Sequence, residues 1–268
     1  MNIVVIGHGM VGHKFLEQLH ALGVADANVT VLCEEPRAAY DRVHLSEFFS
    51  GKSAEDLSLV APGFFEASGF TLRLAARAAA VERRERTVTT ADGEVIPYDR
   101  LVLATGSAPF VPPVPGRDRP HCFVYRTIED LEAMQASAAR SRTGVVVGGG
   151  LLGLECAKAL RDLGLETHVV EFAPRLMAVQ VDDGGGRVLR SKIEDLGVQV
   201  HTGRNTLEIT DGATARHRMV FADGTHLETD MIVFSAGIRP RDEIARQCAL
   251  AIGCLLYTSD AADEGLGV

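Results

Sequence analysis

The sequence has no tryptophan, and its five cysteines, which run from Cys33 to Cys254, include no C-x-x-C pair. A secreted disulfide framework, a four-thiolate zinc or iron-sulfur site and a redox-active vicinal disulfide all need patterned or closely spaced cysteines. The scattered spacing therefore excludes these three arrangements. We expect the thiols to be packing residues, and we predict no metal site.

Long apolar runs and an excess of basic residues are also missing. No run approaches the roughly 18 to 20 apolar residues that cross a bilayer, and the segment Met1–Val5 begins a strand rather than a signal peptide. The formal net charge of -9 argues against a nucleic-acid partner, because phosphate binding depends on clustered Lys and Arg. The sequence therefore predicts a cytoplasmic protein without a membrane or nucleic-acid partner.

What the sequence does contain is one unit that occurs twice: a strand, a glycine-rich turn, a helix and a second strand that ends at a glutamate. The glycines and terminal acids are Gly7, Gly9, Gly12 and Glu34 in the first copy, and Gly148, Gly150, Gly153 and Glu171 in the second. Each copy has the full βαβ context. The repeat predicts an α/β fold with two Rossmann-like dinucleotide-binding domains.

The chemistry of a bound diphosphate explains this pattern. The first glycine makes a tight turn, the second lets the backbone approach the pyrophosphate, and the third lets helix and strand pack closely. The helix N-terminus presents free N–H groups to the anion. Glu34 lies 22 residues after Gly12, and Glu171 lies 18 after Gly153, which matches the acid that binds an adenosine ribose about 20 positions on.

Two small-residue turns follow buried strands between and after these units. Thr105 and Gly106 follow the strand Leu101–Leu103, and Gly237 follows the strand Ile232–Phe234. A single turn of this kind would be explained by a strand that leaves the sheet for a linker. Because the same arrangement recurs after the second unit, a ligand-facing role is favoured. Residues 78 to 97 and 205 to 229 each contain an Asp-Gly pair that is typical of a hairpin, and they predict the crossover sheets of a three-layer fold. Thr127 is expected to cap a helix.

These motifs together resemble the flavoproteins with two dinucleotide-binding domains, the pyridine nucleotide-disulfide oxidoreductase class that includes rubredoxin, ferredoxin and disulfide reductases. The resemblance implies that the first glycine motif with Glu34 holds the ADP part of FAD, that the Ala-Thr-Gly turn lies near the flavin, and that the second motif with Glu171 holds NAD(P)H. It also implicates a further set of residues in cofactor binding: Arg42, Thr105, Gly106 and Gly237.

Longer stretches resemble one subfamily, the large subunits of the NAD(P)H-dependent sirohaem nitrite reductases. They are Tyr40–Ser46, Phe49–Leu59, Cys122–Leu131, Glu171–Pro174 and Phe234–Asp242. The resemblance implies hydride transfer from NADH to FAD and onward electron transfer to iron-sulfur and sirohaem centres that reduce nitrite to ammonium. Those centres would lie in a downstream part that is missing here, so the partners are NAD(P)H, the downstream redox domains and a candidate small subunit.

The nicotinamide end of the site has one candidate catalytic residue, Glu155, which closes the second glycine motif. Related electron-transfer reductases often pair this glutamate with a lysine after a Leu-Ser pair, but that position holds Glu47 here. The partner of Glu155 is therefore left open. NADH is favoured as the donor because Glu171 would repel a 2'-phosphate, while the nearby Arg175 keeps NADPH as the alternative.

We predict four segments: a FAD-binding part at residues 1–118, an NAD(P)H-binding domain at 119–238, the start of a return to the FAD domain at 239–253, and a tail at 254–268. The tail resembles a translated sequencing adapter, so we expect the native similarity to stop near residue 253. A truncated FAD domain is expected to bind FAD weakly or not at all.

Two rival functions stay open at this point. One is a rubredoxin- or ferredoxin-type NADH-dependent reductase, which passes electrons to a separate carrier. The other is a non-catalytic nucleotide-binding or redox-sensing module.

Overall fold

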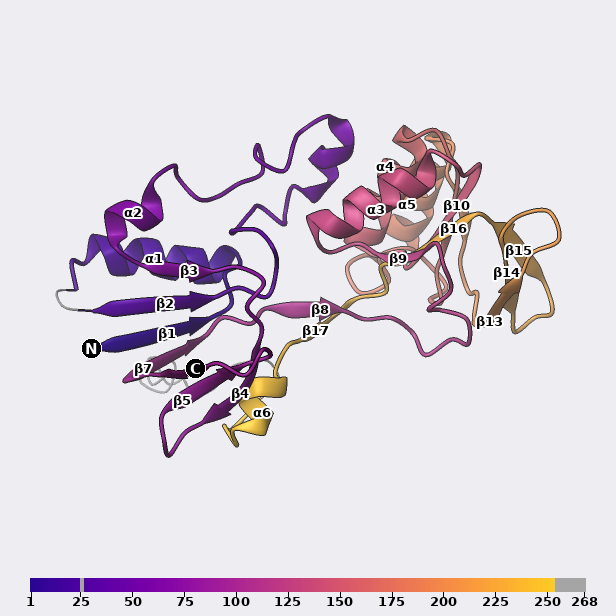
Figure 1. Cartoon of the computed structure of the whole chain (residues 1–268). Helices are drawn as coiled ribbons and strands as arrows, with labels where there is room; N and C mark the ends of the chain where they lie inside the picture. Colours follow the sequence, from indigo (N-terminus) through magenta and orange to yellow (C-terminus); the bar gives the residue numbers. More distant parts are fainter. Residues whose placement is uncertain (25–26, 254–268) are drawn as a thin grey trace. The chain divides into compact units, whose positions relative to one another are not determined.

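The computed structural model describes residues 1–24 and 27–253, which divide into two compact units (Figure 1). Within the described residues, unit 1 consists of Met1–Val43, Ala54–Ala108 and residues 240–253, and unit 2 consists of His44–Ser53 and Pro109–Arg239. Two short strands, β8 (Ser107–Pro109) and β17 (Ile238–Pro240), pair with each other where the chain passes from one unit to the other.

Unit 1 is built on a four-stranded sheet with the order β3-β2-β1-β7, in which every pair is parallel. A three-stranded antiparallel sheet, β4-β5-β6, accompanies it. The elements in chain order are β1 (Asn2–Ile6), α1 (Met10–Ala21), β2 (Asn28–Leu32), α2 (Phe64–Ser68), β3 (Thr71–Arg73), β4 (Ala78–Glu82), β5 (Thr87–Thr90), β6 (Val95–Pro97), β7 (Arg100–Leu103) and α6 (Glu243–Gln247).

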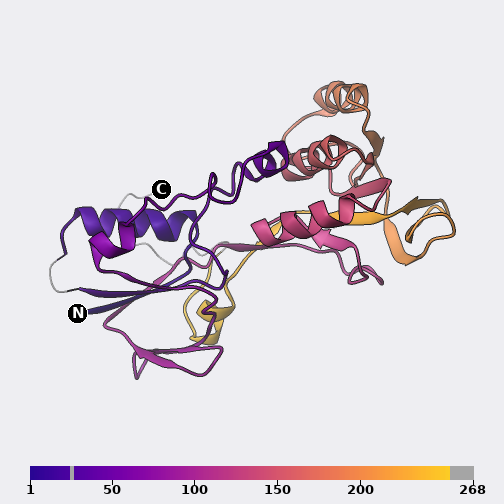
Figure 2. The same cartoon turned by 45° about the horizontal axis from the view of Figure 1, so that its top comes forward.

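The core of unit 1 has two halves, because successive side chains of β1 point to opposite faces of the sheet. Ile3 and Val5 pack with Leu16 of α1 on one face. Val4 and Ile6 pack with Val81 of β4 on the other. Figure 2 shows the resulting layers, with α1 on one side of the parallel strands and the antiparallel sheet on the other.

Unit 2 repeats this plan on a five-stranded parallel sheet with the order β12-β11-β10-β16-β9. Its elements in chain order are η1 (Leu45–Ser50), β9 (Cys122–Val124), α3 (Ile128–Ala138), β10 (Thr143–Val147), α4 (Leu151–Asp162), β11 (Glu166–Val170), α5 (Asp183–Asp195), β12 (Gln199–His201), β13 (Thr206–Asp211), β14 (His217–Phe221), β15 (His226–Thr229) and β16 (Met231–Phe234). The 3-10 helix η1 packs against α3 and α4.

A second antiparallel sheet, β13-β14-β15, covers one face of the parallel strands in unit 2. Val145 of β10 and Phe234 of β16 pack there against Met219 of β14, which is fully buried. Helix α4 packs against β10 and β11. The doubled strand–helix–strand unit and both crossover sheets predicted from the sequence are therefore confirmed.

The local signals inside these units also match the structure. The Asp92-Gly93 and Asp223-Gly224 pairs lie in the turns after β5 and β14. Thr127 caps α3, since its hydroxyl accepts a hydrogen bond from the Asp130 amide at 3.2 Å while the Asp130 carboxylate accepts from the Thr127 amide at 2.8 Å. The predicted cap is thus a complete capping box.

The compact units group residues 44–53 and 109–118 with unit 2, whereas the predicted segments place both ranges in the FAD-binding part. Residues 44–53 include η1, which packs on α3 and α4. For residues 109–118, the Ile209 amide donates to the Pro115 carbonyl at 2.8 Å, and a Cβ on Gly116 would lie 2.1 Å from the Ile209 carbonyl oxygen. Residues 240–253 group with unit 1. The predicted artefactual tail at 254–268 lies outside the described residues.

The cysteines of the described chain are packing residues. Cys33, Cys156 and Cys248 are buried, and none of the four cysteines described forms a disulfide. Burial raises the pKa of the Cys33 and Cys122 thiols to about 11, so both stay protonated at neutral pH. Among residues 1–24 and 27–253, no helix combines the length and apolar character needed to cross a membrane.

Candidate functional site

The first glycine of each motif lies directly against a small-residue turn. Gly7 and Gly148 have φ angles of +107° and +122°, and a Cβ at either position would collide with a backbone carbonyl. The obstructing oxygens belong to Ala104, at 2.1 Å from the Gly7 position, and to Ser235, at 2.3 Å from the Gly148 position. The turns singled out in the sequence therefore lie at the same sheet edge as the glycine motifs of their units.

The second and third glycines are distinguished by the space around them. A Cβ on Gly12 would lie 2.2 Å from the Gly7 carbonyl oxygen, and one on Gly153 would lie 2.0 Å from the Gly148 oxygen. By contrast, no atom lies within 4 Å of the Cβ position at Gly9 or Gly150. Only the second glycine of each motif opens onto space that a ligand can enter, as the chemistry of pyrophosphate binding requires.

The helices that follow these turns start without a side-chain cap. Gly9 is the N-cap of α1 and Gly150 is the N-cap of α4, and neither helix has an acidic residue in its first turn. The first backbone N–H groups of a helix have no partner within the helix, and they carry a partial positive charge. Both N-termini therefore fit an anionic diphosphate.

Glu34, the predicted ribose acid of unit 1, is engaged with two arginines that the sequence did not single out. Its carboxylate accepts a hydrogen bond from Arg241 and lies 3.8 Å from Arg77. The backbone of Arg241 is held in turn, because its carbonyl accepts from the Thr105 hydroxyl at 2.6 Å and its amide donates to the Gly106 carbonyl at 2.9 Å. The structure thus joins Glu34, Thr105 and Gly106 through Arg241.

Arg42, another predicted cofactor residue, has a carboxylate partner of its own. It forms an ion pair with Glu35, and its guanidinium carbon lies 4.6 Å from the centroid of the Tyr40 ring. The Tyr40 hydroxyl donates to the same glutamate at 2.7 Å. Glu35 therefore positions Arg42, a role that the sequence did not reveal because the neighbouring Glu34 fitted the motif.

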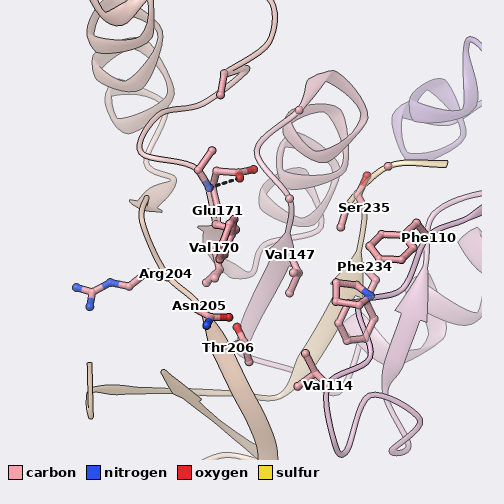
Figure 3. A pocket seen from close by; sticks show the side chains of 18 of the residues that line it. Phe110, Val114, Val147, Val170, Glu171, Arg204, Asn205, Thr206, Phe234 and Ser235 are labelled. Atoms are coloured by element: carbon pink, nitrogen blue, oxygen red, sulfur yellow. Dashed lines mark hydrogen bonds between the residues drawn. The ribbon is translucent and has the colours of Figure 1, made fainter. Parts of the chain in front are cut away.

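Unit 2 contains a cavity of about 560 Å³ beside its glycine motif (Figure 3). This size lies within the range typical of small-molecule sites. Its floor includes Val147, Val170 and Phe234, which are the last residues of three parallel strands. Gly148, Gly150, Glu171, Ser235 and Gly237 also line it, so the structure brings these predicted residues of unit 2 to one place, whereas Gly153 and Glu155 are not among the residues that line the cavity.

The Glu171 carboxylate is fixed by backbone amides. It accepts hydrogen bonds from Gly149 at 2.5 Å, inside the glycine turn, and from Ala173 at 2.6 Å. Figure 3 draws one hydrogen bond at this carboxylate. A charge-assisted hydrogen bond of this kind orients a carboxylate. Each oxygen keeps a further lone pair that can accept a ribose hydroxyl.

Arg175 is the residue because of which NADPH was kept as the alternative donor, and its guanidinium is hydrogen-bonded to groups other than Glu171. Its guanidinium donates to the carbonyls of Val181 at 3.0 Å and Ala178 at 3.1 Å, and to the carboxylate of Asp183 at 2.8 Å. With these three partners it stabilises the segment that leads into α5. Another arginine, Arg204, lines the cavity and was missed in the sequence because it follows no motif.

Glu155 lies on α4, half-buried, and η1 packs against this helix. Burial raises the pKa of its carboxyl, and the charge of His44 opposes that shift. Glu47, at the position where relatives have a lysine, forms an ion pair with Lys52 at 2.5 Å. His44 is thus a neighbour of Glu155 that the sequence did not suggest, and its positive charge, when the ring is protonated, favours the ionised carboxylate.

Comparison with known proteins agrees with this arrangement. The chain is 55% identical over 254 residues to the large subunit of nitrite reductase (NADH) from Escherichia coli K12, covering 94% of this chain and 30% of that protein. It is 56% identical to the nitrite reductase [NAD(P)H] large subunit from Klebsiella oxytoca, covering 94% of this chain and 26% of that one. The predicted resemblance to nitrite reductase large subunits is confirmed, and the chain spans less than a third of these relatives.

Solved structures extend the likeness to the fold. A NAD-dependent persulfide reductase from A. fulgidus superposes with a TM-score of 0.88 at 26% identity, covering 94% of this chain and 49% of that one. Residues 1–256 match the family described as pyridine nucleotide-disulphide oxidoreductase, whose members are oxidoreductases that bind FAD and NAD(P)H. The chain therefore belongs to the pyridine nucleotide-disulphide oxidoreductase family.

Proposed function

We propose that unit 1 binds FAD, that unit 2 binds NADH, and that the chain carries out hydride transfer from NADH to FAD. The observation that carries this proposal is the shared geometry of the two glycine motifs. In each, the first and third glycines are closed by neighbouring carbonyls, while the second opens onto free space at an uncapped helix N-terminus.

The residues of each unit have distinct parts in this proposal. Gly9 and the α1 N-terminus would hold the FAD diphosphate, with Glu34 and Arg42 near the adenosine and Thr105 and Gly106 toward the flavin. Gly150 and the α4 N-terminus would hold the NADH diphosphate, with Glu171 at the ribose and Gly237 further along the cavity. Glu155 remains the candidate for the nicotinamide side.

The chemical step itself needs no protein nucleophile. When bound, the nicotinamide supplies a hydride and the flavin accepts it, which is chemistry that belongs to the cofactors. The protein contributes binding and orientation, which lower the entropic part of the barrier. The apolar floor formed by Val147, Val170 and Phe234 would exclude water from the nucleotide.

Glu171 favours NADH over NADPH. A 2'-phosphate about 4 Å from this carboxylate would feel a repulsion of order 4 kcal/mol at an effective dielectric constant of 20. Arg175, whose guanidinium is bonded to Val181, Ala178 and Asp183, is not placed to offset that charge.

The proposal for the complete reaction rests on the similarity to nitrite reductase large subunits. In a full-length protein of that kind, we propose that electrons pass from FAD to iron-sulfur and sirohaem centres, which reduce nitrite to ammonium. The partners would be the domains that hold those centres and a small subunit, and the protein would work in the cytoplasm.

Anaerobic addition of NADH, with FAD added to saturation because the truncated FAD domain is expected to bind it weakly, tests the proposal. We expect the visible flavin absorbance to bleach, with NADH more effective than NADPH. A flavin that stays oxidised would refute hydride transfer and favour a non-catalytic nucleotide-binding module. Reduced protein that passes electrons to a ferredoxin or rubredoxin, but in full-length form not to nitrite, would favour the carrier-reductase alternative.

A further inference from the structure

Arg204 lines the same cavity as Glu171, yet its side chain is turned away from it (Figure 3). We propose that Asp223 holds Arg204 out of the ribose end of the cavity, and that this restraint is a second determinant of the preference for a nucleotide without a 2'-phosphate. The inference rests on the proposed function, because it assumes that the cavity takes an adenine dinucleotide.

The backbone of Arg204 lies next to the ribose acid. The Arg204 amide donates to the Glu171 carbonyl at 3.0 Å, and the Glu171 amide donates to the His201 carbonyl at 2.9 Å. The segments that follow β11 and β12 are therefore joined at this point. An arginine side chain that starts here is long enough to reach a phosphate on the ribose held by Glu171.

Three contacts hold the guanidinium of Arg204 away from the ribose end of the cavity. It forms an ion pair with Asp223 and donates to the Thr225 hydroxyl at 3.2 Å. Its central carbon lies 5.8 Å from the centroid of the Phe221 ring, within the range of a cation–π contact. Figure 3 shows the guanidinium extending away from Glu171 and Val170.

Asp223 is itself fixed by the turn between β14 and β15. Its carboxylate accepts hydrogen bonds from the Thr225 amide at 3.0 Å and the Thr225 hydroxyl at 2.6 Å. The turn is joined to the Arg204 loop, because the Ala222 amide donates to the Asn205 carbonyl at 2.9 Å. The hairpin therefore fixes the position of the Asp223 carboxylate independently of its ion pair with Arg204.

The charge that Arg204 presents to the ribose end of the cavity determines whether a 2'-phosphate is attracted there. An arginine can bind a phosphate through two parallel hydrogen bonds, so a free Arg204 would attract the 2'-phosphate that Glu171 repels. Paired with Asp223, the arginine contributes little net charge. The side chains of Arg204 and Asp223 are 33% and 47% exposed, and such pairs are worth at most about 1 kcal/mol, so removing the acid should release the arginine at low cost.

The test compares binding of NAD+ and NADP+, which differ only in the 2'-phosphate, to the full chain by titration calorimetry. We expect Asp223→Asn to raise affinity for NADP+ by about threefold to tenfold, the range set by an interaction of about 1 kcal/mol, while affinity for NAD+ changes less than twofold. Adding Arg204→Gln to Asp223→Asn should abolish the gain. Glu171→Gln combined with Asp223→Asn should raise NADP+ affinity further than either change alone.

Asp211→Asn is the matched control, because it removes one surface acid paired with another arginine, Arg119, at the far end of β13. It should leave both affinities unchanged. A gain for NADP+ that survives Arg204→Gln, or that Asp211→Asn reproduces, would overturn the inference, since charge removal alone would then explain it. If the unaltered chain bound neither nucleotide, the proposed function would fail as well; normal NAD+ binding without a gain in Asp223→Asn would refute only the inference.

Discussion

His8, the residue between the first and second glycines of the motif in unit 1, is a structural hydrogen-bonding residue. Its Nδ1 accepts from the Ala39 amide at 3.1 Å, which leaves the proton of the neutral ring on Nε2. That nitrogen lies 3.4 Å from Nδ1 of His13, so the His8 ring donates to the His13 ring. Both side chains are buried, and they tie the glycine turn to α1 and to the segment after β2.

A pair of substitutions at His8 tests this role. His8→Asn keeps an acceptor near the Nδ1 position, whereas His8→Leu leaves the Ala39 amide unpaired in the interior. An unsatisfied buried donor costs about 1–3 kcal/mol, so we expect His8→Leu to lose that much unfolding free energy and His8→Asn clearly less. Urea denaturation measures both, and equal losses would contradict the hydrogen-bonding role.

The same residue predicts a dependence of stability on pH. Burial, and secondarily the charge of His13, lower the pKa of His8 to about 4, whereas an exposed histidine titrates near 6.5. Between these values the unfolded chain binds the proton and the folded chain does not. Stability should therefore fall as pH decreases from about 6.5 to about 4.

The contribution of His8 can be isolated by repeating urea denaturation across this pH range with the His8→Asn variant. Buried histidines such as His168 and His217, whose pKa values burial also lowers, keep part of the slope in the variant. A slope as steep in His8→Asn as in the unaltered protein would show that His8 does not titrate in this way.

At the scale of elements, the sequence predicted what is local and missed what depends on distant contacts. The βαβ units, the Asp-Gly hairpins and the Thr127 cap each follow from residues close together in the chain. The pairing of Glu34 with Arg241 joins residues 207 positions apart, and no local pattern encodes it. The packing of η1 on α4, which brings His44 near Glu155, was not predicted from the sequence for the same reason.

Helix α5 is an element that its own sequence disfavours. Its first turn contains three successive glycines, Gly184, Gly185 and Gly186, and each costs about 1 kcal/mol relative to alanine in a helix interior. The Asp182 side chain partly compensates by capping the helix, since it accepts from the Gly185 amide at 2.7 Å. This cap and the Arg175 contacts to the preceding segment hold the start of the helix, and the helix also packs against β12.

Alanine at two of these positions should therefore act in opposite directions. At Gly184 a new Cβ meets only the Asp182 carboxylate at 3.4 Å and the end of Arg187 at 4.0 Å, so Gly184→Ala should stabilise the protein by about 0.5–1 kcal/mol. At Gly186 the Cβ would lie 2.9 Å from Cδ of Arg175, whose bonds would be disturbed, so Gly186→Ala should give no gain or a loss. Thermal unfolding compares the two, and equal stabilisation would contradict the packing described.

For the whole molecule, the two glycine motifs predict that the two nucleotide sites can be removed one at a time. Gly9 and Gly150 have ordinary extended backbone angles and open Cβ positions, so alanine fits both without strain. Its methyl group would occupy the space where the backbone must meet a diphosphate. Gly9→Ala should therefore lower bound FAD and spare NAD+ binding, and Gly150→Ala should do the reverse, each by at least about tenfold, or about 1.4 kcal/mol.

The third glycines give the contrast that makes the result specific. A Cβ on Gly12 or Gly153 would lie 2.2 Å or 2.0 Å from a carbonyl oxygen, so Gly12→Ala and Gly153→Ala should destabilise the fold itself. Titration with added FAD, NAD+ calorimetry and thermal unfolding separate the two outcomes. If Gly9→Ala and Gly150→Ala each weakened both nucleotides equally while the protein stayed folded, the assignment of one nucleotide to each motif would be wrong.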